Sequence, residues 1–385
     1  MKYGAIFLAL TTTMVMAYGC GGDGEITKTT SGPGSSSSGD PGSSSSGSMG
    51  GAGGASSSSS SGNASSSSTG SSSTGGGPDY KFVMASCSDT PPAGAKLAPD
   101  PKKYSAGTCP QLMEGHNAFP SGNAMRDFRL VLPIDMKPDE RLPILFLWHW
   151  LGGSADDFYD RGQIQMAADT QRFIAVIPES KGDIQFKWPF DNLQSQGRMD
   201  EEFTFFDDML SCVSAQFNVN KECVGSAGVS AGALFTSQLG GFRGDYLSSI
   251  VVLSGGTGGA LIKPFANPEH RMPAVVLWGG PTDNCFQVMN FEQTSKDLEK
   301  NLDARGHFHV ECIHNCGHAE PPLEAPAGLS TYAPMWQFVL DHPYWLGAGE
   351  SPYANGIPAS MPTWCGVGTG SATPRTGTCP GSPGC

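Results

Sequence analysis

The sequence predicts an α/β fold, in which a mostly parallel β-sheet is covered by helices on both faces. Apolar runs typical of buried strands alternate with segments of helical composition across residues 79–385. Alternation of this kind is typical of parallel strands joined by helices. One sharp-turn motif, Gly228-Val229-Ser230-Ala231-Gly232, lies between such a strand and the helix after it. A region of this length suits one domain with a single large core.

The apolar runs place the elements in order along the chain. Strands are predicted at residues 128–133, 144–149, 173–178, 223–229, 250–254, 274–278 and 309–314. Helices are predicted at residues 155–170, 203–217, 231–239, 291–305 and 332–342. The last helix ends before Pro343, because proline cannot continue a helix. A tail rich in glycine and proline follows Trp345.

The motif around Ser230 is the only Gly-x-Ser-x-Gly in the sequence. It follows the apolar run 223–227 and precedes a predicted helix, which is the strand–turn–helix context of a nucleophilic serine. Glycines two positions before and after the serine are expected, because side chains there would clash in so tight a turn. We therefore predict that Ser230 is a nucleophile and that the backbone N–H of Ala231 binds an oxyanion.

A serine hydroxyl needs a histidine to accept its proton and a carboxylate to orient that histidine. Asp283 comes just after the predicted strand 274–278, and His318 just after the strand 309–314. Side chains beyond the ends of parallel strands gather at one edge of the sheet. The chain order Ser230, Asp283, His318 is the order found in hydrolases with a sheet of this kind. We predict that these residues form a catalytic triad.

Other interpretations of the same residues stay open. Pro281-Thr282-Asp283-Asn284 is also good turn chemistry, and His318 is alternatively a histidine of a surface loop. The region is rich in potential metal ligands, namely His307, His309, Cys312, His314, Cys316 and His318. Period-two alternation accounts for the first two histidines as one face of a strand, and export favours oxidised cysteines. We expect no metal and no other cofactor.

The loop after the predicted strand 144–149 is expected to supply the second oxyanion donor. Its sequence is His149-Trp150-Leu151-Gly152-Gly153-Ser154-Ala155. We assign the donor to the backbone N–H of Leu151 or of Trp150. His149 and Trp188 are expected in the substrate cleft. The other tryptophans considered for this cleft, with core filling as the alternative, are Trp148, Trp150 and Trp278.

With these motifs the chain resembles the esterase family that contains extracellular poly(3-hydroxybutyrate) depolymerases and bacterial feruloyl and acetylxylan esterases. The resemblance extends from about Arg126 to about Tyr344. The segment 149–155 resembles the family's His-Gly-x-Gly-Gly-Ser-Ala, with Trp150 in place of the first glycine. Segments 166–178 and 200–208 resemble the family's next helix and strand and the stretch before the serine. Lys187-Trp188-Pro189-Phe190 stands where many members have a loop with Cys-Trp, so the departures concern the acyl-binding side.

The resemblance implies an α/β-hydrolase fold and a serine carboxylic-ester hydrolase acting on plant cell-wall esters of the feruloyl or acetylxylan type. A poly(3-hydroxybutyrate)-type polyester depolymerase is the alternative within this class. A peptidase or an acyltransferase on the same scaffold also stays open, because the triad does not determine the acceptor. An inactive surface module that binds carbohydrate or protein is the alternative of another class.

The N-terminal segment 1–20 has the features of an export signal. Lys2 gives it a charged start, residues 5–16 are apolar, and small residues lead to Cys20. The apolar stretch is too short for a stable membrane span. Cys20 after Gly19 resembles a bacterial lipoprotein cleavage site, so Cys20 is expected to be lipidated. The mature protein would then be an outer-membrane or cell-surface lipoprotein; plain secretion is the alternative.

Residues 21–78 are dominated by glycine and serine and are expected to form a flexible linker, because such a composition cannot build a core. Residues 79–385 are expected to form the catalytic domain with a cysteine-rich C-terminal tail. The formal net charge is −13 and the sequence pI is about 5.0. Without a basic stripe the chain is not expected to bind nucleic acid. The expected partners are an ester substrate, possibly a polymeric one, and a membrane through the lipid alone.

The chain has 11 cysteines. If one carries lipid, 11 − 1 = 10 remain, which allows five disulfides in an oxidising compartment. We expect Cys212–Cys223, and Cys285–Cys316 with Cys312 as the alternative partner of Cys285. The remaining cysteines are expected to staple the two ends of the domain, at Cys87 and Cys109 and at Cys365, Cys379 and Cys385.

Overall fold

The structure, a computed structural model, describes residues 79–286 and 288–381. The predicted export signal with Cys20 and the predicted linker up to residue 78 lie outside the described residues. Their assignments, and the domain boundaries drawn from them, therefore stay predictions.

Within the described residues, a nine-stranded sheet forms the centre of the fold. In order across the sheet, its strands are β13 (Cys365–Val367), β11 (His309–Ile313), β8 (Ala274–Trp278), β7 (Ser249–Leu253), β6 (Val219–Val229), β4 (Leu142–Trp148), β5 (Ile174–Pro178), β3 (Ala124–Val131) and β2 (Gly115–Ser121). The strands from β11 to β5 run parallel, while β13, β3 and β2 are antiparallel to their neighbours. Every strand predicted from the sequence lies in this sheet. β2 was missed because its polar residues and Pro120 suit only an edge strand.

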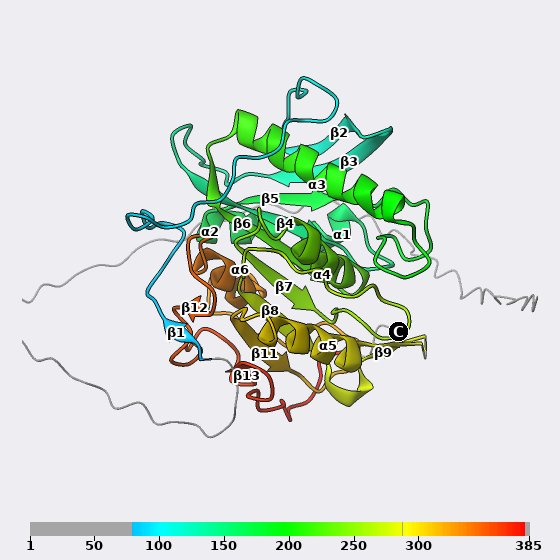
Figure 1. Ribbon diagram of the computed structural model, residues 1–385, viewed down its shortest axis with the longest axis vertical. Helices are drawn as coiled ribbons and strands as arrows, with labels where there is room; N and C mark the ends of the chain where they lie inside the picture. Colours follow the sequence, from blue (N-terminus) through cyan, green and yellow to red (C-terminus); the bar gives the residue numbers. More distant parts are fainter. Residues whose placement is uncertain (1–78, 287, 382–385) are drawn as a thin grey trace, which may run out of the picture. The chain divides into compact units, whose positions relative to one another are not determined.

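Helices cover both faces of the sheet (Figure 1). One face packs against α3 (Gln196–Gln216), α4 (Ala231–Arg243) and α5 (Phe291–Asp303). The other packs against α1 (Ala155–Arg161), α2 (Ile164–Gln171) and α6 (Ala333–Leu340). Side chains of β4 alternate between the faces, since Phe146 joins the first core and Leu145 and Leu147 the second. The predicted α/β architecture is therefore confirmed.

Short pairs of strands complete the described part of the fold. β1 (Lys81–Phe82) pairs with β12 (Glu350–Ser351), and β9 (Asn284–Cys285) pairs with β10 (Met289–Asn290). A single 3-10 turn, η1 (Gly280–Thr282), precedes β9. None of the helices in the described ranges has the length and hydrophobicity that a membrane span needs.

The predicted helices differ from the observed ones at their ends, and two of them differ most. The single helix expected at 155–170 is divided into α1 and α2. The N–H of Gly162 donates to the carbonyl of Phe158 at the end of α1, and Gln163 then adopts a left-handed conformation with φ 51°, which interrupts the helix. The helix expected at 203–217 begins earlier, at Gln196. Ser195 caps this earlier start, since its hydroxyl accepts the N–H of Arg198 at 3.1 Å.

The disulfide pairing expected from the sequence is wrong. The described residues contain the disulfides Cys87–Cys223, Cys109–Cys212, Cys312–Cys365 and Cys316–Cys379. Neither Cys212–Cys223 nor Cys285–Cys316 forms, and Cys312 does not pair with Cys285, which is itself disulfide-bonded. Each of these bridges joins a segment near one end of the domain to a more central one. The expectation that cysteines fasten the two ends of the domain is therefore confirmed for Cys87, Cys109, Cys365 and Cys379, whereas Cys385 lies outside the described residues.

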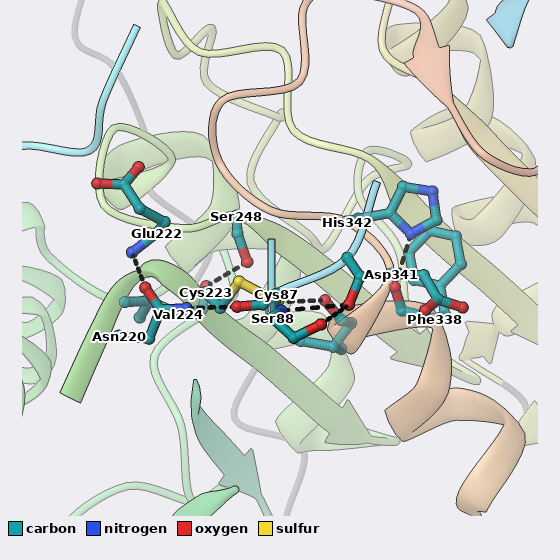
Figure 2. Close-up of a disulfide and its surroundings, with 12 residues drawn as sticks. Cys87, Ser88, Asn220, Glu222, Cys223, Val224, Ser248, Phe338, Asp341 and His342 are labelled. Carbon is teal, nitrogen blue, oxygen red and sulfur yellow. Dashed lines mark hydrogen bonds between the residues drawn. A yellow bond between two sulfur atoms is a disulfide. The ribbon is translucent and has the colours of Figure 1, made fainter. Parts of the chain in front are cut away.

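The disulfide Cys87–Cys223 ties the start of the domain to β6, the strand that leads to Ser230 (Figure 2). The backbone N–H of Cys87 donates to the carbonyl of Leu340 at 2.7 Å. The side-chain amide of Asn220 donates to the carbonyl of Cys87 at 2.8 Å. The segment around Cys87 is thus fixed both to the end of α6 and to β6.

One buried carboxyl group in the core lacks hydrogen-bond partners. Glu299 of α5 has 0% exposure, and neither of its oxygens has a partner among the described residues. Burial raises the pKa of Glu299 to about 9, and the negative charges of Glu311 and Asp303 add to this effect. Because the pKa of Glu299 is higher in the folded than in the unfolded protein, its contribution to stability is fully present below the unfolded pKa. This contribution is lost as the pH rises toward 9.

We expect Glu299→Gln to stabilise the protein at pH 8 and to have little effect near pH 4. The neutral amide removes the cost of deprotonating a buried acid, which grows between about pH 4.5 and pH 9. The gain at pH 8 should be at least ~1 kcal/mol, measured by denaturant unfolding at both pH values. Glu292→Gln, on the same helix but paired with Lys296, is the control. An equal effect of Glu299→Gln at both pH values would contradict the assignment.

Candidate active site

Ser230 occupies a strained turn between β6 and α4. Its backbone has φ 55° and ψ −117°, which is unfavourable for a residue other than glycine. The turn is held in place because the N–H of Ser230 donates to the carbonyl of Leu253 at 2.9 Å, at the end of the neighbouring strand β7. The side chain is 8% exposed. The predicted sharp turn therefore exists at the C-terminal edge of the parallel strands.

The two glycines of the motif allow this turn to pack. A Cβ atom on Gly228 would lie 2.2 Å from the carbonyl oxygen of Gly232, and one on Gly232 would lie 2.0 Å from that of Trp148. No real Cβ atom approaches a backbone oxygen so closely. Glycine is required at both positions because main chain packs directly on main chain.

The structure brings Ser230, His318 and Asp283 together. Nε2 of His318 lies 2.9 Å from Oγ of Ser230, and Nδ1 of His318 lies 2.7 Å from Oδ1 of Asp283. In the arrangement that satisfies both contacts, Nδ1–H donates to the carboxylate and Nε2 accepts from the serine hydroxyl. Asp283 is fully buried, while the side chain of His318 is 11% exposed. Three side chains from separate loops thus form one hydrogen-bonded chain.

Two further groups hold the carboxylate of Asp283. The hydroxyl of Ser254 donates to Oδ2 at 2.8 Å, and the backbone N–H of Gly279 donates to the same oxygen at 2.7 Å. Ser254 directly follows β7 and has a positive φ of 53°. No role was predicted for Ser254 from the sequence, because this serine stands at the end of an apolar strand. Its position at the same sheet edge as the other site residues was the available signal.

The loops that bear Asp283 and His318 contact each other through glycines. The N–H of Gly317 donates to the carbonyl of Gly279 at 3.0 Å, and a Cβ atom on Gly279 would lie 1.9 Å from the oxygen of Gly317. Phe291 stacks on the imidazole of His318, with ring centres 4.2 Å apart and planes at 12°. Backbone contact and stacking therefore hold the two loops together, the role that the predicted Cys285–Cys316 disulfide would have had. The role of Phe291 was not foreseen.

A cavity of about 590 Å³ opens over Ser230 and His318. Aromatic and aliphatic side chains dominate its wall. The aromatic residues are Trp150, Phe158, Phe186, Phe190, Phe286, Phe291 and Tyr332. Two residues of opposite charge, Arg161 and Glu320, also line the cavity. A cavity of this size accommodates a small organic ligand or one segment of a polymer.

The residues predicted to bind the oxyanion line this cavity. Ala231 is the first residue of α4, so its N–H has no acceptor within the helix. Leu151 and Trp150 lie in the loop after β4, and both line the cavity together with Ala231. Residues from the loop after β4 and from the start of α4 thus line the cavity beside Ser230.

The expected position of His149 and Trp188 in the cleft is wrong. Both side chains have 0% exposure, and neither lines the cavity. The indole N–H of Trp188 instead donates to the carbonyl of His149 at 2.8 Å. Trp148 and Trp278 are also fully buried. Of the tryptophans considered, Trp150 alone lines the described cavity, and the others fill the core.

The histidine-rich segment is mostly buried, and its cysteines form disulfides. Burial lowers the pKa of His307, His309 and His314 to about 4, so that they are neutral at pH 7. Cys312 and Cys316 are joined to other cysteines in disulfides. Within the described part of the chain, no group of three or more His, Cys, Asp or Glu side chains is arranged to hold a metal ion.

We expect Ser254→Ala to lower kcat by about tenfold with little change in KM. The variant removes one of the two hydrogen bonds that hold Oδ2 of Asp283, and a hydrogen bond to a charged group contributes ~1.5–3 kcal/mol. Steady-state kinetics on a p-nitrophenyl ester measures the effect. Ser248→Ala is the matched control, because this serine is also buried, precedes the opposite end of β7 and donates to the carbonyl of Val224. Equal kinetics of the two variants would contradict a role for Ser254.

Comparison with family models finds no match, and no curated protein matches the chain. Solved structures do match. The structure titled "Crystal Structure of sOPH Native" is 16% identical, with 69% of this chain and 99% of that chain covered at a TM-score of 0.56. The structure titled "Crystal Structure of pOPH Native" is 16% identical, with 68% and 97% covered at a TM-score of 0.55.

A structure titled "ferulic acid esterase" also matches, with a TM-score of 0.43 over 53% of this chain, and at this level it carries no argument about the substrate. Similarity at so low an identity concerns the fold. It agrees with the strand order, the parallel centre and the helices on both faces. The chain therefore has the α/β-hydrolase fold that its sequence predicts.

Proposed function

We propose that the chain is an exported serine carboxylic-ester hydrolase with Ser230 as nucleophile, His318 as general base and Asp283 as its orienting carboxylate. The observation that carries this proposal is the continuous hydrogen-bonded chain, 2.9 Å from Ser230 to His318 and 2.7 Å from His318 to Asp283. These distances are within the range needed for proton transfer. The apolar cavity above Ser230 supplies the space for an ester.

In the first half of the reaction, Oγ of Ser230 attacks the ester carbonyl while Nε2 of His318 takes the hydroxyl proton. Asp283 keeps the imidazole in the tautomer with Nδ1–H and stabilises the imidazolium that forms. The carbonyl oxygen becomes an oxyanion, which accepts hydrogen bonds from the N–H of Ala231 and from the loop of Trp150 and Leu151. The tetrahedral intermediate collapses, and the alcohol leaves with the proton from His318.

In the second half, His318 takes a proton from water, and the resulting hydroxide attacks the acyl group on Ser230. The same donors bind the second oxyanion. Collapse of this intermediate returns the proton to Ser230 and releases the acid. The route requires neither a metal nor an organic cofactor.

The cavity wall favours an ester with an aromatic or extended apolar acyl group. Its ring-lined volume of about 590 Å³ is far larger than an acetyl group needs. Among plant cell-wall esters, this favours the feruloyl type over the acetylxylan type. A polyester of the poly(3-hydroxybutyrate) type is the second candidate, because Phe286 and Val288 at the cavity are 64% and 63% exposed and offer an apolar rim to a polymer surface.

Export is supported by the disulfides of the described residues, since such bonds persist in oxidising compartments. Lipidation of Cys20 and the choice between a lipoprotein and a freely secreted enzyme stay proposals based on the sequence.

We expect Ser230→Ala to lower kcat on p-nitrophenyl butyrate by roughly 10⁴-fold or more, because the covalent route is lost. The thermal unfolding midpoint should stay close to that of the unchanged protein. A fluorophosphonate probe should label the unchanged protein and fail to label the variant. Activity retained by a clean preparation of the variant would refute the assignment, and absence of labelling in the unchanged protein would favour an inactive binding module.

A substrate panel separates the candidate classes. We expect kcat/KM on methyl ferulate to exceed that on acetylated xylan at least tenfold, because the aromatic wall contacts a feruloyl group and not an acetyl group. Release of acid from a poly(3-hydroxybutyrate) film, with no activity on methyl ferulate, would instead support the polyester depolymerase. The Ser230→Ala variant serves as the blank for each substrate.

A further inference from the structure

One peptide group in the loop after β4 is held in a defined orientation. The carbonyl oxygen of Trp150 lies 2.8 Å from Nδ1 of His149 and also accepts the N–H of Gly153 at 3.0 Å. Two groups thus converge on a single carbonyl. In a trans peptide the N–H of the next residue points opposite to the carbonyl. The N–H of Leu151 must therefore point away from His149 and Gly153.

The N–H of Leu151 is available as a donor. Among the described residues, no backbone or side-chain acceptor is found for it. Leu151 lines the cavity beside Ser230 and Ala231. Its loop follows β4, which pairs directly with the strand of Ser230, since Trp148 lies opposite Gly228. The N–H of Leu151 is therefore a candidate for oxyanion binding.

The orientation of this peptide depends on the protons of His149. A bare Nδ1 facing a carbonyl oxygen at 2.8 Å would be repulsive, so Nδ1 carries a hydrogen. On the other side of the ring, Nε2 lies 3.3 Å from Oε1 of Glu179. The N–H of Ser180, 3.4 Å from Nε2, is nearer to Oε1 of Glu179 at 3.2 Å.

Glu179 also holds the far end of the same loop. Its Oε2 accepts the N–H of Ala155 at 2.8 Å, at the start of α1. Although burial by itself raises the pKa of Glu179, hydrogen bonds from His149, Ala155 and Ser180 lower it overall, so the group is a carboxylate at neutral pH. The side chain of His149 is held in place, because it is fully buried and the centre of the Trp188 ring lies 4.9 Å from the centre of the imidazole.

We propose that Glu179 and His149 are positioning residues, which hold the peptide between Trp150 and Leu151 so that the N–H of Leu151 binds the oxyanion. This inference rests on the proposed esterase function and adds the device that orients its second donor. The hydrogen bond from Nδ1–H of His149 polarises the carbonyl of Trp150 and thereby strengthens the N–H of the same peptide as a donor. Glu179 stabilises the imidazole and anchors Ala155.

The test compares kcat with KM in Glu179→Gln, His149→Phe and His149→Asn. We expect the first two variants to lower kcat on p-nitrophenyl butyrate by 10- to 100-fold with KM within about twofold, because a donor that acts on the oxyanion is realised in the transition state. His149→Asn should recover most of the loss, since the amide nitrogen of asparagine replaces Nδ1–H. Fluorophosphonate titration gives the concentration of competent sites for each variant.

A transition-state analogue separates oxyanion binding from a general effect on stability. For an alkyl trifluoromethyl ketone, which forms a hemiketal oxyanion on the serine, Ki should rise by the same factor by which kcat/KM falls. Glu140→Gln is the matched control, because Glu140 pairs with Arg172 in the segment just before the other end of β4. It should leave kcat, KM and Ki unchanged.

The inference is overturned if KM rises while kcat is unchanged, if Ki does not follow kcat/KM, or if His149→Asn is as impaired as His149→Phe. In each of these cases the unchanged protein still hydrolyses esters and is labelled, so the esterase proposal survives. Failure of the unchanged protein to be labelled or to hydrolyse any ester would instead refute the proposed function itself. Should Glu179→Gln not fold, the pair of His149 variants decides the matter.

Discussion

The candidate site depends on the close approach of three stretches of main chain, the end of β4, the end of β6 and the start of α4. A Cβ atom on Gly232 would lie 2.0 Å from the carbonyl oxygen of Trp148, and one on Gly228 would lie 2.2 Å from that of Gly232. Glycine alone permits this packing. The consequence is that the end of β4 and the first turn of α4 lie against each other, and residues from both line the cavity beside Ser230. The positive φ of Ser230 is tolerated because the surrounding strands hold the turn.

A buried charge is the second constraint. Asp283 is inaccessible to solvent, and a carboxylate in such a place is unfavourable unless donors satisfy it. Oδ2 accepts from Ser254 and Gly279, which follow the ends of β7 and β8, while Oδ1 accepts from His318. The donors from strand ends hold the carboxylate before any substrate binds. His318 can therefore lie on a loop and still have a defined orientation, because its partner and the stacked ring of Phe291 are rigid.

The strands and the order of the three site residues could be predicted from the sequence, because buried parallel strands are continuous apolar runs and site residues follow their ends. The disulfide pairing could not be predicted, because it depends on which segments distant in the sequence meet in the fold. Cys212, for example, pairs with Cys109, which lies 103 residues earlier in the sequence. Trp188 shows a related limit. Its sequence context indicates an aromatic residue near the cleft, but only the packing reveals that it points into the core and holds the carbonyl of His149. Ser254 carries no local motif, and its role arises from the adjacent ends of two strands.

The C-terminal tail belongs to the same argument, because it supports the segment that leads to His318. Cys316, two residues before the histidine, is bound to Cys379, and the N–H of Arg375 donates to the carbonyl of Ile313 at 3.0 Å. The guanidinium of Arg375 also donates to the side chain of Asn315 at 2.9 Å. A loop beyond the end of a strand opens more easily than the strand itself. Covalent and polar links from the tail limit that opening where a displacement of about 1 Å would break the contact with Ser230. The tail therefore contributes to the position of His318 beside Ser230, although it lies outside the βα units that build the sheet.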